Sequence, residues 1–144
     1  MATINATVNI TSDISSYPVS INTSMTMKKL GSCHGLDETT GLRTKKFTST
    51  TDAVIVEHDE LTDDKAHKLY IRNTSSNKEH FFYVAYNASA AAATTAETIG
   101  KLYAKDWMIF SYDGNTNITV ASNGAAEQTL EYMVFADGIV TAAG

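Results

Sequence analysis

Hydrophobic and polar residues alternate with a period of two over many short segments of the chain. Residues 3–10 show this pattern first, and residues 19–27 repeat it directly after Pro18, the one proline of the sequence. A period of two marks a β-strand with one buried face, and a proline is tolerated at a strand start. The apolar positions of the first segment are Ile4, Ala6, Val8 and Ile10.

The middle of the chain predicts a loop at 31–41, a surface strand at 43–51 and a short buried strand at 53–57. Residues 67–87 predict a β-hairpin, because two aromatic and β-branched runs flank the polar sequence NTSSNKE. The alanine-rich stretch 88–97 has two interpretations. Its alanines and a Thr–Glu pair at capping-box spacing favour a short helix, and its low complexity favours a long crossing loop.

The last third of the chain predicts four further strands, in IGKLYA, KDWMIFSYDG, TNITVAS and TLEYMVFAD. Turn signals separate them at the regular spacing that is typical of a sandwich or barrel. The pair Asp113-Gly114 predicts a tight hairpin, because such turns need positive φ angles. Strands do not alternate with long helices, which argues against a parallel α/β sheet.

The fold class predicted is therefore all-β. We expect residues 1–144 to form one antiparallel β-sandwich of about 8 to 10 short strands. A jelly roll, an immunoglobulin-like sandwich and a barrel all fit the alternation. Residues 1–12 are expected either to form an N-terminal arm or edge strand, or to pair inside the same sandwich.

Charge and cysteine content narrow the classes of partner. The formal net charge of −5 argues against binding to phosphate backbones and to anionic membranes, so we expect neither a nucleic acid nor a membrane partner. Cys33 is the one cysteine, which excludes an intrachain disulfide. The first residues lack a basic start and a long apolar run, so we expect synthesis in the cytoplasm.

Candidate chemistry is sparse. Cys33 and His34 are adjacent, which is not a zinc-ligand spacing, and the acidic run 57–64 lacks the order of an EF-hand loop. No nucleophile elbow or phosphate-binding loop is present. We therefore predict no catalytic residue, no cofactor and no metal site. The candidates for an aromatic sugar-binding platform are Tyr86, Tyr103, Trp107 and Tyr112.

Residues 107–112 are apolar on both faces, and two other segments, around Val84 and Val134, repeat this feature. One face can fill the sandwich core, but the other needs a loop, the N-terminal arm or a neighbouring subunit to cover it. We therefore expect a homo-oligomer, with a trimer favoured. The candidate interface residues are Ile4, Val8, Ile10, Phe82, Tyr86, Trp107, Phe110 and Tyr112.

Three stretches carry a family resemblance, namely KLYIRNTSSNKEHFFYVAYN, IGKLYAKDWMIFSYDGNTNITVAS and LEYMVF. The region from Lys68 to Phe135 resembles small all-β virion proteins of tailed bacteriophages. In those proteins a Lys-Leu-Tyr-Ile-x-Asn strand leads to a paired strand, an Ile-Gly-x-Leu segment precedes an acidic-aromatic strand that ends in Asp-Gly, and a Glu-Tyr-x-x-Phe strand follows.

The resemblance implies a structural part of a virion with no catalytic residues. Within that group, size and single-domain organisation favour a capsid decoration (cement) protein, made in the host cytoplasm, located on the capsid surface and bound to the major capsid protein. A tail or baseplate component and a glycan- or receptor-binding β-sandwich module are the alternatives.

Overall fold

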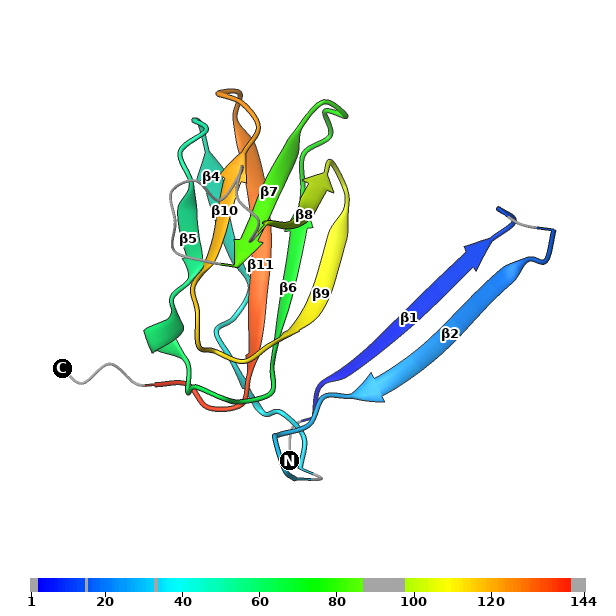
Figure 1. Cartoon of the computed structure of the whole chain (residues 1–144), viewed down its shortest axis with the longest axis vertical. Helices are drawn as coiled ribbons and strands as arrows, with labels where there is room; N and C mark the ends of the chain where they lie inside the picture. The colour runs from blue at the N-terminus through cyan, green and yellow to red at the C-terminus, as the bar shows by residue number, and fades with distance from the viewer. Residues whose placement is uncertain (1–2, 15, 33, 87–97, 141–144) are drawn as a thin grey trace.

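The computed structural model describes residues 3–14, 16–32, 34–86 and 98–140. They form a two-layer β-sandwich from which a separate β-hairpin projects (Figure 1). The strands in this described part are β1 (Asn5–Ser12), β2 (Val19–Thr26), β3 (Glu38–Thr39), β4 (Arg43–Phe47), β5 (Ala53–Val56), β6 (His67–Asn73), β7 (Phe81–Tyr86), β8 (Thr98–Tyr103), β9 (Trp107–Tyr112), β10 (Ile118–Ser122) and β11 (Gln128–Ala136). A short 3-10 helix, η1 (His58–Glu60), follows β5.

The strand order identifies the type of sandwich. One sheet has the order β5-β10-β7-β8, and the other has β3-β11-β6-β9, with β4 also paired to β11. All of these pairs are antiparallel. From β4 onward, the chain builds β4-β11-β6-β9 opposite β5-β10-β7-β8, which is the double Greek-key order of an eight-stranded jelly roll. The predicted all-β sandwich is confirmed, and the topology selects the jelly roll among its forms.

The core lies between the two sheets. Along β6 and β11, buried and half-buried residues alternate strictly, as expected for strands with one face in the core. Phe47 and Phe82 meet edge to face near one end, with ring centroids 5.1 Å apart. Leu69, Ile71, Val84, Ile118, Val120 and Leu130 are completely buried.

The hairpin predicted for residues 67–87 is wrong. β6 pairs with β9 and β11, whereas β7 pairs with β8 and β10 in the opposite sheet. Both strands bring apolar side chains into one core from opposite sides, so the chain crosses the gap of about 10 Å between sheets. In this crossing, the hydroxyl of Ser75 contacts Nδ1 of His80 at 2.8 Å.

The tight hairpin predicted at Asp113-Gly114 is also wrong, because β9 and β10 lie in different sheets. The requirement for glycine is nevertheless real. Gly114 has a φ of +89°, and a Cβ at this position would lie 2.7 Å from the carbonyl oxygen of Thr62. Gly114 therefore permits a close crossing over the residues that follow η1, rather than a two-residue turn.

The N-terminal segment is part of a hairpin arm. β1 pairs with β2 over its whole length, from Asn5 opposite Thr26 to Ser12 opposite Val19. The two strands form a separate sheet, so β1 does not pair inside the sandwich. The stretch 88–97, for which the sequence left helix and loop open, lies outside the described residues.

Candidate interface

The hairpin arm, residues 3–14 and 16–27, has one apolar and one polar face. Directly opposed residues of an antiparallel pair point to the same side, so the register assigns every residue to a face. The apolar face consists of the pairs Ala6–Met25, Val8–Thr23, Ile10–Ile21 and Ser12–Val19. The polar face consists of the pairs Asn5–Thr26, Thr7–Ser24, Asn9–Asn22 and Thr11–Ser20.

Most of the arm is exposed. Every residue of β2 is exposed, including Ile21 and Met25 with 45% and 47% of their surface accessible. On the polar face, the hydroxyls of Thr7 and Ser24 lie 2.8 Å apart. A two-stranded hairpin is at best marginally stable in water without a third layer. We therefore expect the apolar face of the arm to pack against another protein surface.

A second apolar surface lies on the outer side of the sheet that contains β9, β6 and β11. Ile109 is opposite Tyr70, and Tyr70 is opposite Met133, so these three side chains form a row across the sheet. The period of two places Trp107 and Phe135 on the same side, and it also places the polar and charged residues Lys68, Arg72, Ser111 and Glu131 there, on either side of the row. We define the outer patch as Tyr70, Trp107, Ile109, Met133 and Phe135.

Trp107 is the most exposed member of the outer patch, with 55% of its surface accessible. Tyr70 is half-buried, and its hydroxyl donates a hydrogen bond to Oε1 of Glu131 at 3.1 Å. Burial, with a further contribution from Glu131, raises the pKa of the Tyr70 phenol. Tyr70 therefore stays protonated and presents an uncharged ring to the patch.

An apolar groove separates the arm from the outer patch. Its volume is about 290 Å³, and a smaller hollow of about 110 Å³ continues along the arm beside Ile109. No charged side chain of the described residues lines either cavity. The groove is lined by Ile4, Asn5, Ala6, Met27, Leu42, Tyr70, Ile109, Met133 and Phe135.

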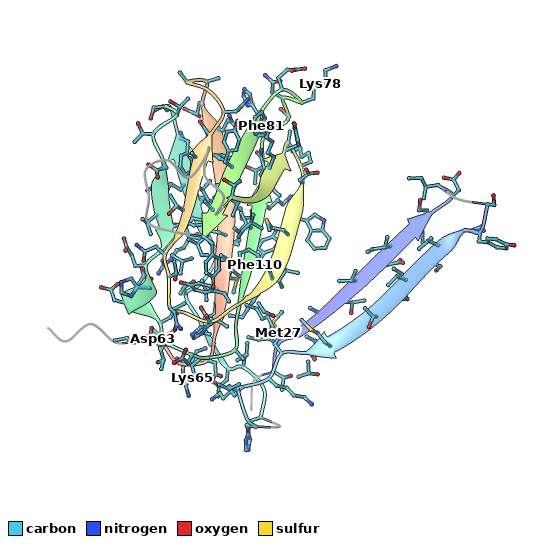
Figure 2. All side chains as sticks on the ribbon, viewed as in Figure 1. Met27, Asp63, Lys65, Lys78, Phe81 and Phe110 are labelled. Atoms are coloured by element: carbon cyan, nitrogen blue, oxygen red, sulfur yellow. The ribbon has the colours of Figure 1, made fainter. Side chains whose placement is uncertain are left out.

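The base of the arm is fixed to the sandwich by buried side chains. Met27 lies where the hairpin meets the body (Figure 2) and is 2% exposed, and Leu36 is completely buried. The Met27 amide donates to the carbonyl of Ile4 at 2.9 Å, and the Leu36 amide donates to the carbonyl of Met27 at 2.8 Å. These contacts set the direction in which the arm leaves the body.

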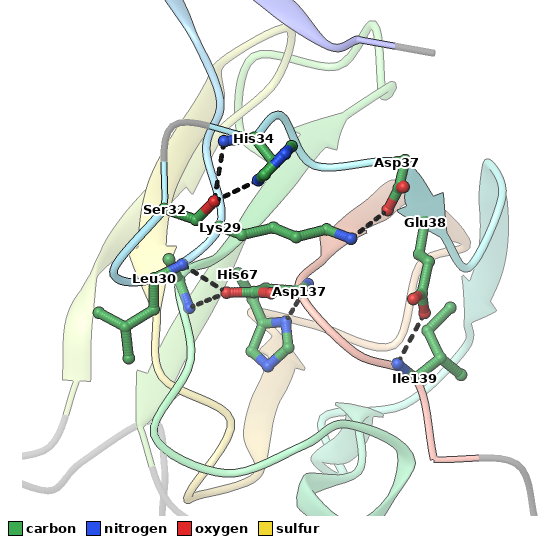
Figure 3. Close-up of polar contacts among 10 residues, drawn as sticks. Lys29, Leu30, Ser32, His34, Asp37, Glu38, His67, Asp137 and Ile139 are labelled. Atoms are coloured by element: carbon green, nitrogen blue, oxygen red, sulfur yellow. Dashed lines mark hydrogen bonds and ion pairs between the residues drawn. The ribbon is translucent and has the colours of Figure 1, made fainter. Parts of the chain in front are cut away.

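Asp137 links the segment after the arm to the sandwich (Figure 3). Its Oδ2 accepts hydrogen bonds from the amides of Leu30 at 2.7 Å and Ala66 at 3.4 Å. Its own amide donates to Nδ1 of buried His67 at 2.9 Å. Because Nδ1 accepts, His67 carries its proton on Nε2 and donates it to the Thr62 carbonyl at 2.8 Å. Both ring nitrogens are thus used structurally.

Two further contacts hold this segment (Figure 3). Lys29 pairs with Asp37 at 2.9 Å. Their hydrogen bond raises the pKa of Lys29 and lowers that of Asp37. The amide of Ile139 donates to Oε2 of Glu38 at 2.8 Å. The segment between β2 and β4 is therefore tied to the end of β11 at several points.

The residues that the sequence assigned to an interface divide into two groups. Ile4, Val8 and Ile10 lie on the arm, and Trp107 lies in the outer patch. Their role at an interface stays a prediction. The remaining assignments are Phe82, Tyr86, Phe110 and Tyr112.

Phe82 and Tyr112 are 0% and 2% exposed core residues, so their assignment to an interface is corrected. Phe110 is partly buried against the same core. Tyr86 is half-buried, and its hydroxyl donates to Oδ1 of Asp113 at 3.0 Å. The apolar pattern showed that β7 and β9 have two apolar faces, but it did not show which face enters the core.

The sequence interpretation missed most of the outer patch. Tyr70, Ile109, Met133 and Phe135 were not assigned to an interface. Tyr70, Met133 and Phe135 each lie one residue from a buried core position, and Ile109 lies between Met108 and Phe110, which are partly buried against the core. The alternation along β6 and β11 was the available signal. This alternation identifies an apolar patch only once the register shows that β6, β9 and β11 are neighbours.

The other candidate sites are not assembled. Among the described residues, no three His, Cys, Asp or Glu side chains converge on a position that could hold a metal ion. In the acidic run, Glu60 lies 3.4 Å from Arg43, and Oδ1 of Asp64 accepts a hydrogen bond from Asn115. Within the described ranges, no helix is long and apolar enough to cross a bilayer.

The proposed sugar platform is only partly assembled. Tyr86 and Tyr112 lie side by side, with ring centroids 6.0 Å apart, but Tyr112 is buried in the core. Trp107 lies in the outer patch, and Tyr103 is on the outer side of the opposite sheet. There Tyr103 contacts Phe81, with ring centroids 5.1 Å apart. The Lys101 ammonium lies 5.0 Å from the centroid of the Phe81 ring.

Comparisons with known proteins give little further information. No model of a known protein family and no curated protein matches the chain. Among solved structures, the chain is similar to the Yersinia pseudotuberculosis-derived mitogen, with a TM-score of 0.43 and 9% sequence identity, over 74% of this chain and 97% of that one. This likeness is too distant to indicate a shared function.

Proposed function

We propose that the protein is a non-enzymatic structural protein of a phage virion that acts through protein–protein contacts, most specifically a capsid decoration (cement) protein. The observation that carries this proposal is the hairpin arm, which projects from a fixed base and leaves its apolar face exposed. Exposed apolar surfaces of this kind commonly mark sites of protein–protein interaction, which supports a protein that joins its neighbours.

The dimensions of the arm support this role. Each strand has eight residues, which corresponds to a length of roughly 27 Å, and the part beyond Val8 leads away from the sandwich. Its apolar face supplies hydrophobic contact area, and its Asn, Thr and Ser face offers many hydrogen-bonding groups that remain soluble before assembly. Interfaces commonly combine apolar anchors with polar surroundings in this way.

The jelly-roll body is compatible with the same role. This fold occurs in viral capsid domains, in lectins and in cupins, so it does not by itself decide function. The resemblance of residues 68–135 to phage virion proteins favours the first of these classes. We place the protein on the capsid surface in contact with the major capsid protein. A tail or baseplate component shares the same features.

A glycan- or receptor-binding module is the second candidate. The observation in its favour is the aromatic group Phe81, Tyr83 and Tyr103 on the outer side of β7 and β8. However, these rings contact one another, and Lys101 lies over two of them. Little open ring surface remains for a sugar to stack on, so we rank this function second.

The proposal is tested on virions of the phage whose genome carries this coding sequence. Quantitative mass spectrometry of purified virions should find the protein in a fixed ratio to the major capsid protein, and gold-labelled antibodies should mark the head. Absence from purified virions would reject the proposed function. Labelling confined to the tail would replace capsid decoration by the tail alternative.

A further inference from the structure

We infer that the arm packs on a second copy of this chain, with its apolar face against the outer patch of that copy. The inference rests on the proposed function, of which it names one contact. Both surfaces belong to the same molecule, and each exposes apolar side chains that its own copy leaves uncovered.

The apolar face of the arm is only partly covered by its own molecule. Ala6 and Val8, near the base, line the cavities beside Ile109. Ile10 and Ile21, farther along, are 49% and 45% exposed. Because the base is held by buried residues and by Asp137, the far half of the arm leads away from its own sheet (Figure 1). A cover for that half has to come from another molecule.

The distribution of charge favours a second copy as that molecule. The chain has a net charge of −5, yet Asp13 near the tip is the one charged residue between positions 1 and 27. No charged side chain of the described residues lines the groove. Two identical acidic proteins repel each other over most of their surfaces, so contact is least costly between the uncharged face of the arm and the uncharged row of Ile109, Tyr70 and Met133.

The size of the contact indicates reciprocal exchange. A face of two eight-residue strands covers on the order of 270 Å², whereas a stable interface buries about 800 Å² on each partner. A single arm on a single patch is too small. When two copies exchange arms, the contact doubles to about 540 Å² on each copy, or roughly 1,080 Å² in total, which reaches the lower bound of about 1,000 Å² for a specific interface. Such an exchange closes as a symmetric assembly.

The test compares three double variants by size-exclusion chromatography with light scattering. The arm variant is Ile10→Lys with Ile21→Lys, and the patch variant is Ile109→Glu with Met133→Glu. We expect the wild-type protein to form a defined oligomer and both the arm variant and the patch variant to be monomeric, whereas the third variant is a control. Circular dichroism checks that each variant retains the sandwich, and the arm variant leaves the core untouched.

Asn9→Lys with Asn22→Lys is the matched control. These residues form the neighbouring pair on the same two strands, and the control adds the same charge to the opposite face of the arm. It should remain oligomeric. Loss of the oligomer in this control as well would mean that added charge, rather than the apolar face, breaks the assembly, and would overturn the inference.

Mixing the arm and patch variants distinguishes two possibilities. In one the arm binds the outer patch of another copy, and in the other it folds back onto the sheet of its own copy. The arm variant keeps a native patch, and the patch variant keeps a native arm, so a mixed assembly contains a native contact that neither variant can make alone. The variant lysines and glutamates also attract each other. We expect the mixture to recover association. No recovery would overturn exchange between copies.

Trp107 provides a second readout, because it is the one tryptophan of the chain and belongs to the outer patch. Its emission should shift to shorter wavelength and acrylamide should quench it less as the wild-type concentration rises, and the arm variant should show neither change. A wild-type protein that stays monomeric up to its solubility limit would reject the inference. Its presence in virions would still leave the proposed function standing.

Discussion

Phe82 and Trp107 occupy opposite environments, although both are aromatic residues on strands of the sandwich. Phe82 is fully buried and packs edge to face on Phe47. Trp107 is 55% exposed on the outer side of β9. Their contributions to folding should therefore differ.

Phe82→Ala is expected to lower the free energy of unfolding by about 3–5 kcal/mol, because it leaves a cavity between the sheets. Trp107→Ala should change it by less than about 1 kcal/mol, because the side chain is largely in water. Urea denaturation followed by circular dichroism measures both at a concentration where the protein is monomeric. A large loss for Trp107→Ala would show that its ring belongs to the fold rather than to a contact surface.

Asp137 is a second residue whose role can be measured. Asp137→Ala removes the acceptor for the Leu30 and Ala66 amides and should cost about 1.5–3 kcal/mol, the range for hydrogen bonds to a charged group. Hydrogen exchange at the Leu30 amide should accelerate. Asp137→Asn retains an acceptor oxygen and should have a smaller effect. Equal losses for both variants would mean that the charge matters and the acceptor geometry does not.

At the scale of elements, the arm and the sandwich are built from separate sheets. The described strands of the arm pair only with each other, and the Met27 amide already lies 2.9 Å from the Ile4 carbonyl. Replacing residues 5–26 by two glycines should therefore leave the melting temperature of the monomeric body within a few degrees. The same change should abolish association. Calorimetry and light scattering measure the two effects, and a large fall in melting temperature would show that the arm stabilises its own body.

The hairpins wrongly predicted at residues 67–87 and at Asp113-Gly114 have one physical cause. Residues 67–73 and 81–86 are correctly predicted as strands, because the period of two reports which side chains enter a core. The pattern is identical for two strands that pair with each other and for two that face each other across the core. Only the register of β6 with β9 and β11 resolves this ambiguity.

At the scale of the whole molecule, stability should fall at alkaline pH. Burial is the main cause that raises the pKa values of Tyr70, Tyr86 and Tyr112 in the folded state. The folded protein therefore keeps phenol protons that the unfolded chain loses above about pH 10. This contribution to stability is complete below pH 10 and is lost as pH rises toward the folded pKa values.

Tyr112 should dominate this dependence, because it is 2% exposed. The free energy of unfolding should fall by about 1.4 kcal/mol per pH unit for a tyrosine that ionises only in the unfolded state. Tyr112→Phe cannot ionise and should make the decline above pH 10 shallower. Urea titrations from pH 8 to about 11.5 measure this slope. An unchanged slope would contradict the role assigned to Tyr112.

The sequence by itself determined the all-β class, the alternating faces of residues 3–10 and 19–27 and the positions of most strands, because these depend on local alternation and on β-propensity. It left open whether the first segment forms an arm or pairs inside the sandwich. Tertiary structure alone decided which strands share a sheet, that Phe82 and Tyr112 fill the core, and that Ile109, Tyr70 and Met133 meet in one row. These features depend on contacts between residues far apart in the chain. A period of two defines the two faces of a strand, but it does not show which face is covered by another element.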